Sequence, residues 1–559
     1  MQGIDIEKNG ENGVARLPAD TKLNQPDQKV RNVSGQSNDE GASSNGKSRK
    51  VRAKNLTEVL HGVETITPLP SAVEIRQIVC DSRTVEPGAI FFALRGAKET
   101  GQAFVADAIQ RGAVAVVSDE PVTAVIRPGV TAIQVREARK ALAIASANFY
   151  DHPANALNLV AVTGTNGKTT TTSVIDAIIK ASKSKTGLFG TIAYETPKDK
   201  YPAPNTTPES VDLQGFLAEI RDAGGKFAVL EASSHSLTMD RLWGLHFSAT
   251  VFTNLTREHM DYHKTFEDYF AAKKTLFTGT GAGAPDTAII NIDDDYGKQL
   301  FGLAKKTVSY GLESGADITT KKFQLSFNGL AFTAQTPNGK IQITSSLVGR
   351  INVYNILAAI GAAQALGLSN EVIEAGIRDL ESVSGRFQRI DQGQPYLVIV
   401  DYAHTDDALE SLIRTARELN PKGRIIMLFG CGGSKDRTKR PVMGEVSGRL
   451  SDLTILSNDN PRQEDPLRII SDIIVGVQKT SGKYVIEPDR EKAIGLAMDE
   501  ARAGDIVLLA GKGHENYQIL ADRTLEFDDR EVARRALIQR GYRAAATTGK
   551  SNKNGKEVT

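Results

Sequence analysis

A short β-branched run followed by a glycine-containing loop constrains the fold of this chain more than any other feature. Residues 157–163, LNLVAVT, are almost entirely apolar, which is typical of a strand buried on both faces. The loop Gly-Thr-Asn-Gly-Lys-Thr-Thr follows at 164–170 and leads into a helical pattern, TTTSVIDAIIKAS. This order predicts a strand, a turn of backbone N–H groups and a helix N-terminus, an arrangement suited to phosphate oxygens.

The residue types in this loop indicate a nucleoside triphosphate. Lys168 is expected to reach the terminal phosphates, and the Thr169 hydroxyl is expected to bind Mg²⁺. The common phosphate-loop pattern has a glycine five residues before the Gly-Lys pair, where this chain has Val162; its first glycine is Gly164. An ordinary strand–helix turn is the alternative, and the buried strand before the loop favours ATP.

Bulk properties exclude several classes of protein. A chain of 559 residues is too long for one core, so roughly three to four domains are expected. The formal net charge of +1 provides no general attraction for nucleic acid or an anionic membrane. The two cysteines, Cys80 and Cys431, fit a reducing cytosol. No apolar run approaches the roughly 20 residues of a membrane helix.

Composition and periodicity divide the chain into five parts. Residues 1–54 and 544–559 are nearly free of large apolar side chains and are expected to be disordered extensions, including the basic cluster KSRKVRAK at 47–54. Short apolar runs and helical patterns predict a small α/β domain at 55–154. A βαβ series predicts a mainly parallel sheet at 155–382, with an antiparallel hairpin between 317 and 348. A third α/β unit is expected at 383–543.

Three further residues of the central segment are candidates for metal chemistry. Glu231 ends the predicted strand FAVLE, where a Mg²⁺ ligand is needed beside a phosphate loop. His259 follows the next strand, and a structural role for this histidine is the alternative. Lys273 lies on a predicted helix, and sequence physics alone does not distinguish it from a solvated surface lysine.

Four loops of the last unit are rich in charged residues and glycine. They follow four predicted strands, and ligands of open α/β sheets bind at the carboxyl ends of strands. Four such loops at one edge predict a pocket for a zwitterionic, multiply charged small molecule. The loops are DYAHTDD (401–407), GCGGSKDRTKRP (431–441), NDNPR (458–462) and GKGHE (511–515).

Together these motifs resemble the Mur ligases, ATP-dependent amide-forming enzymes of peptidoglycan synthesis, over roughly residues 55–543. The matching segments are GTNGKTTT (164–171), EASSHSL (231–237), TNLTREHMDYH (253–263), GRINVYNILAA (349–359) and DYAHTDDALE (401–410). The resemblance implies an α/β fold of three domains: a small nucleotide-sugar-binding domain, a central P-loop-type domain and a C-terminal Rossmann-like domain. It also implies ATP and Mg²⁺ as cofactors.

Within the family the motifs are most similar to the branch that joins meso-diaminopimelate to UDP-N-acetylmuramoyl-L-alanyl-D-glutamate. The resemblance assigns phosphate-loop, nucleotide-sugar, ATP and amino-acid contacts residue by residue. The ATP contacts are Gly164, Thr165, Asn166, Gly167, Lys168, Thr169, Thr170, Asn352 and Arg386. The contacts to the nucleotide-sugar peptide are Ser82, Thr206, Thr207, Ser233 and Arg241. The contacts to the added amino acid are Lys435, Asp459, Asn460, Pro461, Arg462, Gly511 and Glu515.

Two positions depart from the family pattern. Met239 stands where a substrate-binding glutamine is usual, and Lys435 stands where an arginine is expected. A lysine is a point donor that cannot form a bidentate guanidinium–carboxylate pair, and the nearby Arg437 is a candidate substitute.

The implied reaction has two steps. The D-glutamyl side-chain carboxylate attacks the γ-phosphate of ATP, and the amine of the incoming amino acid then displaces phosphate from the acyl phosphate. One Mg²⁺ is assigned to Thr169 and Glu231, and a second to His259 and a carbamate formed on Lys273. His404, with Asp401, is expected to help organise ATP or the amine. Three domains that bind three substrates imply closure before chemistry.

Several alternatives remain open at this stage. The nearest are the same reaction with L-lysine or another diamino acid, and a folylpolyglutamate-type ligase. An inactive binding homologue and a P-loop motor or GTPase are more distant alternatives. The expected partners are the small-molecule substrates, with no nucleic acid and no membrane insertion, and a cytoplasmic monomer is expected.

Overall fold

The computed structural model describes residues 52–543, apart from residues 71, 97–98, 261 and 314. The tail 544–559 and residues 1–51 of the predicted N-terminal extension lie outside the described residues. Lys54, which the sequence assigned to that extension, belongs to a strand. The chain divides into two compact units between Val383 and Ser384.

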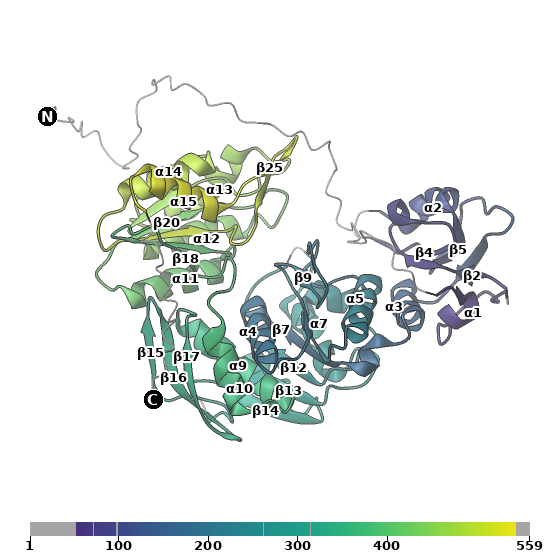
Figure 1. Cartoon of the computed structure of the whole chain (residues 1–559). Helices are drawn as coiled ribbons and strands as arrows, with labels where there is room; N and C mark the ends of the chain where they lie inside the picture. The colour runs from purple at the N-terminus through teal and green to yellow at the C-terminus, as the bar shows by residue number, and fades with distance from the viewer. Residues whose placement is uncertain (1–51, 71, 97–98, 261, 314, 544–559) are drawn as a thin grey trace, which may run out of the picture. The chain divides into compact units, whose positions relative to one another are not determined.

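The first unit begins with a small α/β region (Figure 1). Its parallel sheet has the order β3-β4-β5-β6, and β1 pairs with β2 in a separate antiparallel ribbon. The strands are β1 (Lys54–Asn55), β2 (Glu74–Ile75), β3 (Gln77–Val79), β4 (Ala89–Phe92), β5 (Ala113–Ser118) and β6 (Thr131–Gln134). The helices are α1 (Leu56–Val59), α2 (Val105–Arg111) and α3 (Ala138–Phe149), with 3₁₀ turns η1 (Ser82–Thr84), η2 (Gly101–Phe104) and η3 (Pro153–Ala156).

The same unit contains an eight-stranded sheet in the order β10-β9-β8-β11-β7-β12-β13-β14. The six strands from β8 to β14 are parallel, and β9 and β10 are antiparallel. The strands are β7 (Asn158–Thr163), β8 (Thr186–Phe189), β9 (Tyr194–Glu195), β10 (Lys200–Tyr201), β11 (Phe227–Glu231), β12 (Ala249–Phe252), β13 (Thr287–Asn291) and β14 (Lys306–Tyr310). The mainly parallel sheet predicted from the sequence is confirmed.

Helices cover both faces of this sheet, which explains the apolar run at β7. Val160 and Val162 pack in a cluster with side chains of α4, α9 and α10, whereas Leu159 and Ala161 pack with side chains of α5 and α7. Alternate residues of the strand therefore enter two different cores. The helices are α4 (Lys168–Ala181), α5 (Ser210–Asp222), α6 (Ser234–Thr238), α7 (Phe266–Thr278), α8 (Asp295–Lys298), α9 (Arg350–Ala365) and α10 (Asn370–Asp379).

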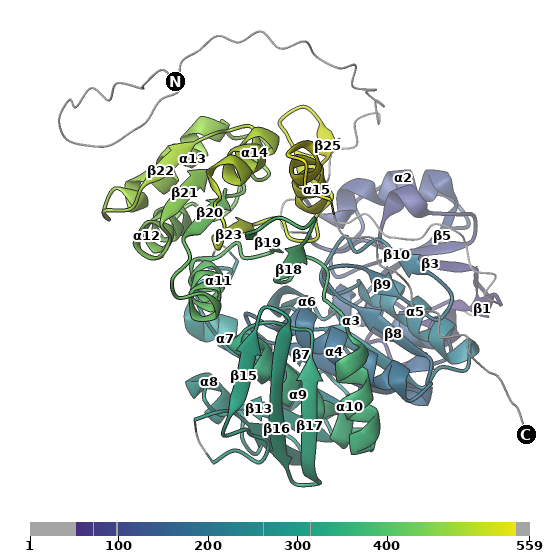
Figure 2. The same cartoon turned by 60° about the vertical axis from the view of Figure 1, so that its left-hand side comes forward.

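The predicted hairpin is confirmed and belongs to a larger element. Strands β15 (Phe323–Ser326), β16 (Gly329–Thr336) and β17 (Gly339–Ser345) form an antiparallel sheet, and α10 lies beside β17 (Figure 2). The turn between β16 and β17 is at Pro337-Asn338, as the sequence predicts.

The second unit has a six-stranded sheet in the order β18-β19-β23-β20-β21-β22. All strands are parallel except β18, and a small antiparallel ribbon, β24-β25, follows β23. The strands are β18 (Gln388–Ile390), β19 (Leu397–Asp401), β20 (Ile425–Phe429), β21 (Leu453–Leu456), β22 (Tyr484–Ile486), β23 (Ile506–Ala510), β24 (Tyr517–Ile519) and β25 (Thr524–Glu526). The helices are α11 (Asp406–Leu419), α12 (Lys439–Leu450), α13 (Pro466–Val477), α14 (Arg490–Glu500) and α15 (Asp529–Gln539).

The four strands predicted for this unit are neighbours in its sheet. Because β19, β23, β20 and β21 are adjacent and parallel, the loops that follow them meet at one edge, as predicted. Edge strands β18 and β22 were not predicted. Within the described part of the chain, no helix is both long and apolar enough to cross a membrane.

Candidate functional site

The glycine loop has the geometry of a phosphate cradle. It joins β7 to α4, and Gly164 and Gly167 have φ angles of 146° and 88°. A Cβ atom at Gly164 would lie 1.9 Å from Thr253 Oγ1, and one at Gly167 would lie 2.5 Å from Asn355 Oδ1. Only glycine fits these two positions, because both the backbone angles and the space exclude a side chain. Asn254 fixes the loop between them, since its side-chain oxygen accepts from Asn166 N at 2.9 Å.

The charged groups of the loop are placed for an anion. Lys168 Nζ donates to Gly164 O at 3.0 Å and to Thr165 O at 2.8 Å, so the ammonium lies over the loop that precedes it. Helix α4 is 14 residues long and begins at Lys168, so its N-terminal N–H groups and positive dipole end face the same loop. These residues fit the phosphates of ATP.

Thr169 and Glu231 meet although 62 residues separate them. Strand β11, which ends at Glu231, is the direct neighbour of β7. Thr169 Oγ1 donates to Glu231 Oε2 at 3.1 Å, and Thr191 donates to both oxygens of the carboxylate, through its N–H at 2.9 Å and its hydroxyl at 3.1 Å. A hydroxyl beside an oriented carboxylate suits Mg²⁺, which prefers oxygen ligands. No group of three or more His, Cys, Asp or Glu side chains suited to a metal occurs among the described residues, so any site here has a mixed ligand set.

Lys273 is buried beside the loop. Helix α7 places its side chain in the interior with 1% exposure, where Nζ donates to Gly164 O at 2.8 Å and lies 4.6 Å from the centre of the Tyr269 ring. Burial and the nearby Lys168 ammonium lower the pKa of Lys273 well below its ordinary value, against the attraction of Glu258. The structure therefore distinguishes this lysine from a surface residue, which the sequence alone did not.

His259 lies in an aromatic cluster next to Lys273. Its backbone has a φ of 57°, and its ring is 4.8 Å from that of His235 and 6.2 Å from that of Tyr269. His259 Nε2 lies 3.6 Å from Glu258 Oε2. Tyr269 thus contacts both His259 and Lys273, which the sequence paired as ligands of one ion.

The predicted contacts to the nucleotide-sugar peptide form a chain of hydrogen bonds that starts at Glu231. Thr207 Oγ1 donates to Glu231 O at 2.7 Å and accepts from Ser233 N at 3.1 Å, and Arg241 Nη1 donates to Thr207 O at 3.1 Å. Thr206 Oγ1 lies 3.2 Å from Thr191 Oγ1. The structure therefore brings these predicted residues together beside the phosphate loop.

Met239 and Glu209 complete the surroundings of Arg241. Met239, which stands where the family usually has a glutamine, contacts the Arg241 guanidinium. Its Sδ lies 3.6 Å from Arg241 Nη2. Glu209 Oε2 lies 3.2 Å from Arg241 Nε and 3.8 Å from Arg139 Nη1. Glu209 was not predicted as a site residue, although it lies in the same segment as Thr206 and Thr207, NTTPES at 205–210.

Asn352 and Ser82 occupy different surroundings. Asn352 is buried in α9, where its Nδ2 donates to Val348 O at 2.7 Å and its Oδ1 accepts from Asn355 Nδ2 at 2.8 Å. Asn355 in turn lies beside Gly167, so Asn352 is connected to the phosphate loop through Asn355. Ser82 is buried in the small α/β region, in η1 after β3, where its hydroxyl lowers the pKa of Asp107 by hydrogen bonding.

In the second unit, Arg386, Asp401 and His404 surround Tyr402 at the end of β19. Asp401 accepts from Phe387 N at 2.6 Å and from Ala403 N at 2.8 Å, and burial raises its pKa. The Arg386 guanidinium lies 4.7 Å from the centre of the Tyr402 ring. His404 Nδ1 is 2.8 Å from Tyr402 O. The structure brings these three predicted residues together.

The loops after β21 and β23 bring the predicted amino-acid contacts together. Asn460 Nδ2 donates to Glu515 Oε2 at 2.9 Å, and Asn460 Oδ1 accepts from Ile519 N at 2.9 Å. Gly511, with a φ of 109°, begins the loop that returns to Glu515. Lys512, inside the same loop, contacts both Asn460 and Glu515 and was not predicted, although the GKGHE segment contains it.

The remaining predicted contacts lie around the loop after β20. Arg462 follows Pro461 with a φ of 52°, and its Nη1 donates to Gly433 O at 3.1 Å. Lys435 is exposed on the same loop. Arg437 pairs with Asp472 at 3.1 Å, so in this structure its guanidinium is directed to α13.

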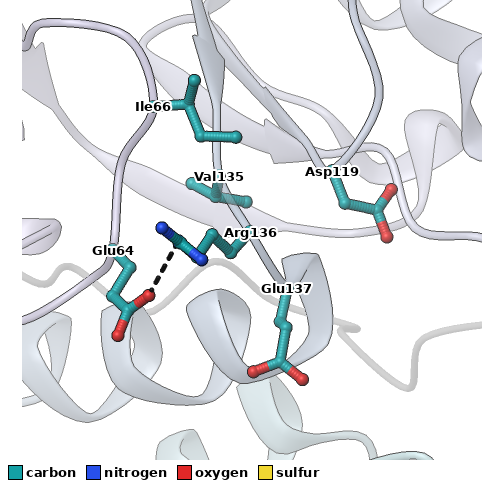
Figure 3. Close-up of a pocket in the computed structure, with 6 residues that line it drawn as sticks. All are labelled: Glu64, Ile66, Asp119, Val135, Arg136 and Glu137. Atoms are coloured by element: carbon teal, nitrogen blue, oxygen red, sulfur yellow. Dashed lines mark ion pairs between the residues drawn. The ribbon is translucent and has the colours of Figure 1, made fainter.

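A separate pocket lies in the small α/β region (Figure 3). It is lined by Glu64, Ile66, Asp119, Val135, Arg136 and Glu137, and none of the predicted site residues is among them. Glu64 and Arg136 form an exposed ion pair across it.

Comparison with known families matches three consecutive segments. Residues 74–150 match the Mur ligase family catalytic domain, residues 162–363 the Mur ligase middle domain, and residues 385–513 the Mur ligase glutamate ligase domain. A relative from Solibacter usitatus is 48% identical over 494 residues, which are 87% of this chain and 99% of the relative.

The chain belongs to the Mur ligase family.

Several relatives that resemble this chain along most of their length share one name. The proteins from Solibacter usitatus and Geobacillus kaustophilus are both UDP-N-acetylmuramoyl-L-alanyl-D-glutamate–2,6-diaminopimelate ligases, and the second is 44% identical over 84% of this chain and 96% of its own length. A solved structure with the same name has a TM-score of 0.61 at 32% identity and covers 88% of this chain and 100% of its own. The family and the multidomain α/β fold predicted from the motifs are confirmed.

Proposed function

We propose that this Mur ligase uses ATP to join meso-diaminopimelate to UDP-N-acetylmuramoyl-L-alanyl-D-glutamate in peptidoglycan synthesis. The observation that supports this proposal most strongly is the shared name of relatives that are 41–48% identical over at least 82% of the chain. The phosphate loop, Glu231 and Lys273 supply the groups that such a reaction requires.

The residues of the phosphate loop are proposed to hold and orient ATP. When bound, ATP supplies the phosphoryl group that activates the D-glutamyl carboxylate as an acyl phosphate. Lys168 and the N-terminal amides of α4 neutralise phosphate charge, and Gly164 and Gly167 let the backbone approach the phosphates closely. Asn352 supports this loop through Asn355 rather than by direct contact.

Two magnesium sites are part of the proposal. Thr169 and Glu231 would hold one ion, and Mg²⁺ supplies charge neutralisation to the phosphates. His259 and a carbamate on Lys273 would hold the other. A carbamate forms only on a neutral amine, and the lowered pKa of the buried Lys273 increases the fraction of that form. Carbon dioxide adds to the amine, a proton leaves, and the product is an anionic oxygen ligand.

The substrates would be held by the two hydrogen-bonded clusters. Thr206, Thr207, Ser233 and Arg241 are proposed to orient the peptide carboxylate beside the phosphate loop. In the second unit, Glu515, Asp459 and Arg462 are proposed to pair with the ammonium and carboxylate groups of diaminopimelate. Pro461 and Gly511 shape these loops, and Asp401, His404 and Arg386 are proposed to contact ATP or the amine.

Phosphate release tests this proposal. Purified protein is supplied with ATP, Mg²⁺ and UDP-N-acetylmuramoyl-L-alanyl-D-glutamate, and meso-diaminopimelate, L-lysine and L-ornithine are compared at equal concentrations. We expect phosphate release with meso-diaminopimelate to be at least ~10²-fold faster than with L-lysine or L-ornithine. Both of these lack the second carboxylate, and a polar site strongly rejects an analogue that leaves one of its groups unpaired. Equal or faster release with L-lysine would contradict the proposed specificity, and no release with any amino acid would favour an inactive homologue.

A further inference from the structure

Lys512, to which the proposed function gives no role, lies at the centre of a charged cluster. Its side chain is fully buried, with an exposure of 0%. Nζ donates to Glu515 Oε2 at 3.1 Å and to Asn460 Oδ1 at 3.4 Å, and it lies 3.7 Å from Asp459 Oδ1. One ammonium therefore contacts three residues, Asp459, Asn460 and Glu515, which belong to two different loops.

The backbone places Lys512 in this position through two glycines. Gly511 and Gly513 have φ angles of 109° and 55°, and a Cβ at Gly513 would lie 2.7 Å from Tyr402 Cβ. The resulting turn is closed by a hydrogen bond from Glu515 N to Lys512 O at 2.9 Å. Lysine and glutamate three residues apart thus point to the same side of the loop after β23.

The charge of Glu515 depends on the groups around it. Burial raises the pKa of Glu515, and the nearby Asp459 raises it further, whereas Lys512 and the Asn460 amide lower it. Asp459 Oδ1 is buried and accepts no hydrogen bond within the described part of the chain. The other charged or titratable groups with an electrostatic interaction with this cluster include Tyr402, Cys431, Arg462, Arg490 and Tyr517. Arg490 is held by Asp529, with two bonds of 2.6 and 2.8 Å.

The exposures within the cluster separate contact residues from supporting ones. The Asp459 and Glu515 side chains retain 12% and 14% exposure, so each can meet a small ligand, whereas Lys512 has none. A small ligand can therefore contact the two carboxylates but not the Lys512 ammonium.

We propose that Lys512 is a positioning residue for the incoming amino acid, because its buried ammonium contacts Glu515 and Asp459 and orients both carboxylates toward an ammonium group of that substrate. This inference rests on the proposed function, and in particular on the binding of the amino acid at the loops after β21 and β23. The substrate class is an amino acid that brings a cationic amine to a carboxylate pair.

Three variants of the full chain test this role. Lys512→Met removes the charge while keeping the length of the side chain, and Lys512→Gln keeps a hydrogen-bond donor without charge. Arg424→Met is the matched control, because Arg424 pairs with Asp505 at 2.7 Å at the opposite, amino end of β20 and β23. For each variant, KM for meso-diaminopimelate, KM for ATP, kcat and the thermal unfolding midpoint are measured between pH 6.5 and pH 9.

We expect Lys512→Met to raise KM for meso-diaminopimelate at least tenfold at pH 7, with KM for ATP changed less than twofold. Without Lys512 the pKa of Glu515 rises further, so a larger fraction of Glu515 is protonated at the low end of this pH range than at the high end. The ratio of variant to wild-type KM should therefore fall with rising pH. Lys512→Gln should behave similarly with a smaller change, and Arg424→Met should leave KM for the amino acid unchanged.

Other results would overturn the inference. An unchanged KM for the amino acid, a KM ratio that does not vary with pH, or equal increases for ATP and the amino acid would each show a structural role only. The same conclusion holds if both Lys512 variants are unfolded under conditions where Arg424→Met is folded. The proposed function fails separately, if the wild-type protein itself releases no phosphate with meso-diaminopimelate.

Discussion

Two buried lysines, each at the carboxyl end of a parallel sheet, have opposite surroundings. Lys273 contacts a carbonyl oxygen and an aromatic ring, and among the described residues no carboxylate lies within ion-pair distance of it. Lys512 lies within 4 Å of two carboxylates. Burial without a counterion favours a neutral amine, whereas burial between carboxylates favours an ammonium.

This difference matches the chemistry proposed for the two sheet ends. A neutral amine beside the phosphate loop can be converted into a metal ligand, and a fixed cation beside two acids can keep them ready for a cationic substrate. The same residue type, equally buried, is thus proposed to have a reactive role in one unit and a supporting role in the other. The four predictions below test this contrast, from the largest expected effect to the smallest.

Lys273→Ala should lower kcat by about 10²–10³-fold, because it removes the group proposed to become a magnesium ligand. Added short carboxylates should restore part of the activity by occupying the same space. Lys274→Ala, the adjacent and less buried lysine of α7, is the matched control and should retain wild-type activity. Phosphate release with and without acetate measures the effect, and full activity of Lys273→Ala would remove the contrast between the two lysines.

Glu231→Gln should lower kcat about 10²-fold at ~1 mM Mg²⁺. A loss of about this size is typical when one group that stabilises transition-state charge is removed. The amide keeps the shape of the side chain but loses the charge that Thr169 and Thr191 orient. Activity should recover partly at higher Mg²⁺, and KM for meso-diaminopimelate should not change. A Mg²⁺ titration at saturating ATP measures this; a dependence identical to that of the wild type would argue against Glu231 as a ligand.

Arg462→Ala should change KM for the amino acid and not the Mg²⁺ dependence, the reverse of Glu231→Gln. KM for meso-diaminopimelate should increase roughly tenfold to a hundredfold, in line with the loss of a charge-assisted hydrogen bond, while KM for ATP and the Mg²⁺ dependence stay unchanged. Arg468→Ala, in α13, is the control. Initial rates over a range of amino-acid concentrations measure the effect. An increase confined to KM for ATP would place Arg462 outside the amino-acid site.

The smallest effects are on stability and should have opposite signs. The pKa of Lys273 is lower in the folded state than in the unfolded chain, so the folded protein binds fewer protons and gains stability as the pH rises toward about 10.4. Lys273→Met removes this penalty and should raise the unfolding midpoint at pH 7 by roughly 2–4 °C, an advantage that shrinks as the pH increases. Lys512→Met leaves two carboxylates without their cation and should lower the midpoint by a similar amount.

Both midpoints are measured by thermal unfolding without ATP or Mg²⁺. The buffer contains no bicarbonate, because carbamylation would change the charge at Lys273. Two shifts of the same sign would show that the surroundings of the two lysines do not decide their charge states.

Much of the fold could be predicted from local patterns. Examples are the apolar strands at 157–163 and 227–231 and the glycine loop between β7 and α4. Each of these elements is continuous in sequence, so its periodicity and residue types are sufficient to predict it. The edge strands β18 and β22 were not predicted, because each is three residues long, shorter than the runs of four to eight residues by which a strand is identified in a sequence.

The candidate site was predicted less completely. Thr169 and Glu231 could be named from strand ends, but their hydrogen bond depends on β7 and β11 being neighbours. Lys273 could be named only through the family resemblance, and Lys512 and Glu209 were not named. The burial of a lysine and the charge of its neighbours depend on long-range contacts that no local pattern records.

The sequence by itself therefore determined which backbone segments can bind phosphate and where strands end, because glycine, β-branched residues and helix starts act locally. The tertiary structure decided which charges meet. It placed Lys273 against a carbonyl 109 residues away and Lys512 beside a carboxamide 52 residues away. Coulombic and desolvation effects depend on distance in space and on loss of water, and only the folded sheets fix these quantities.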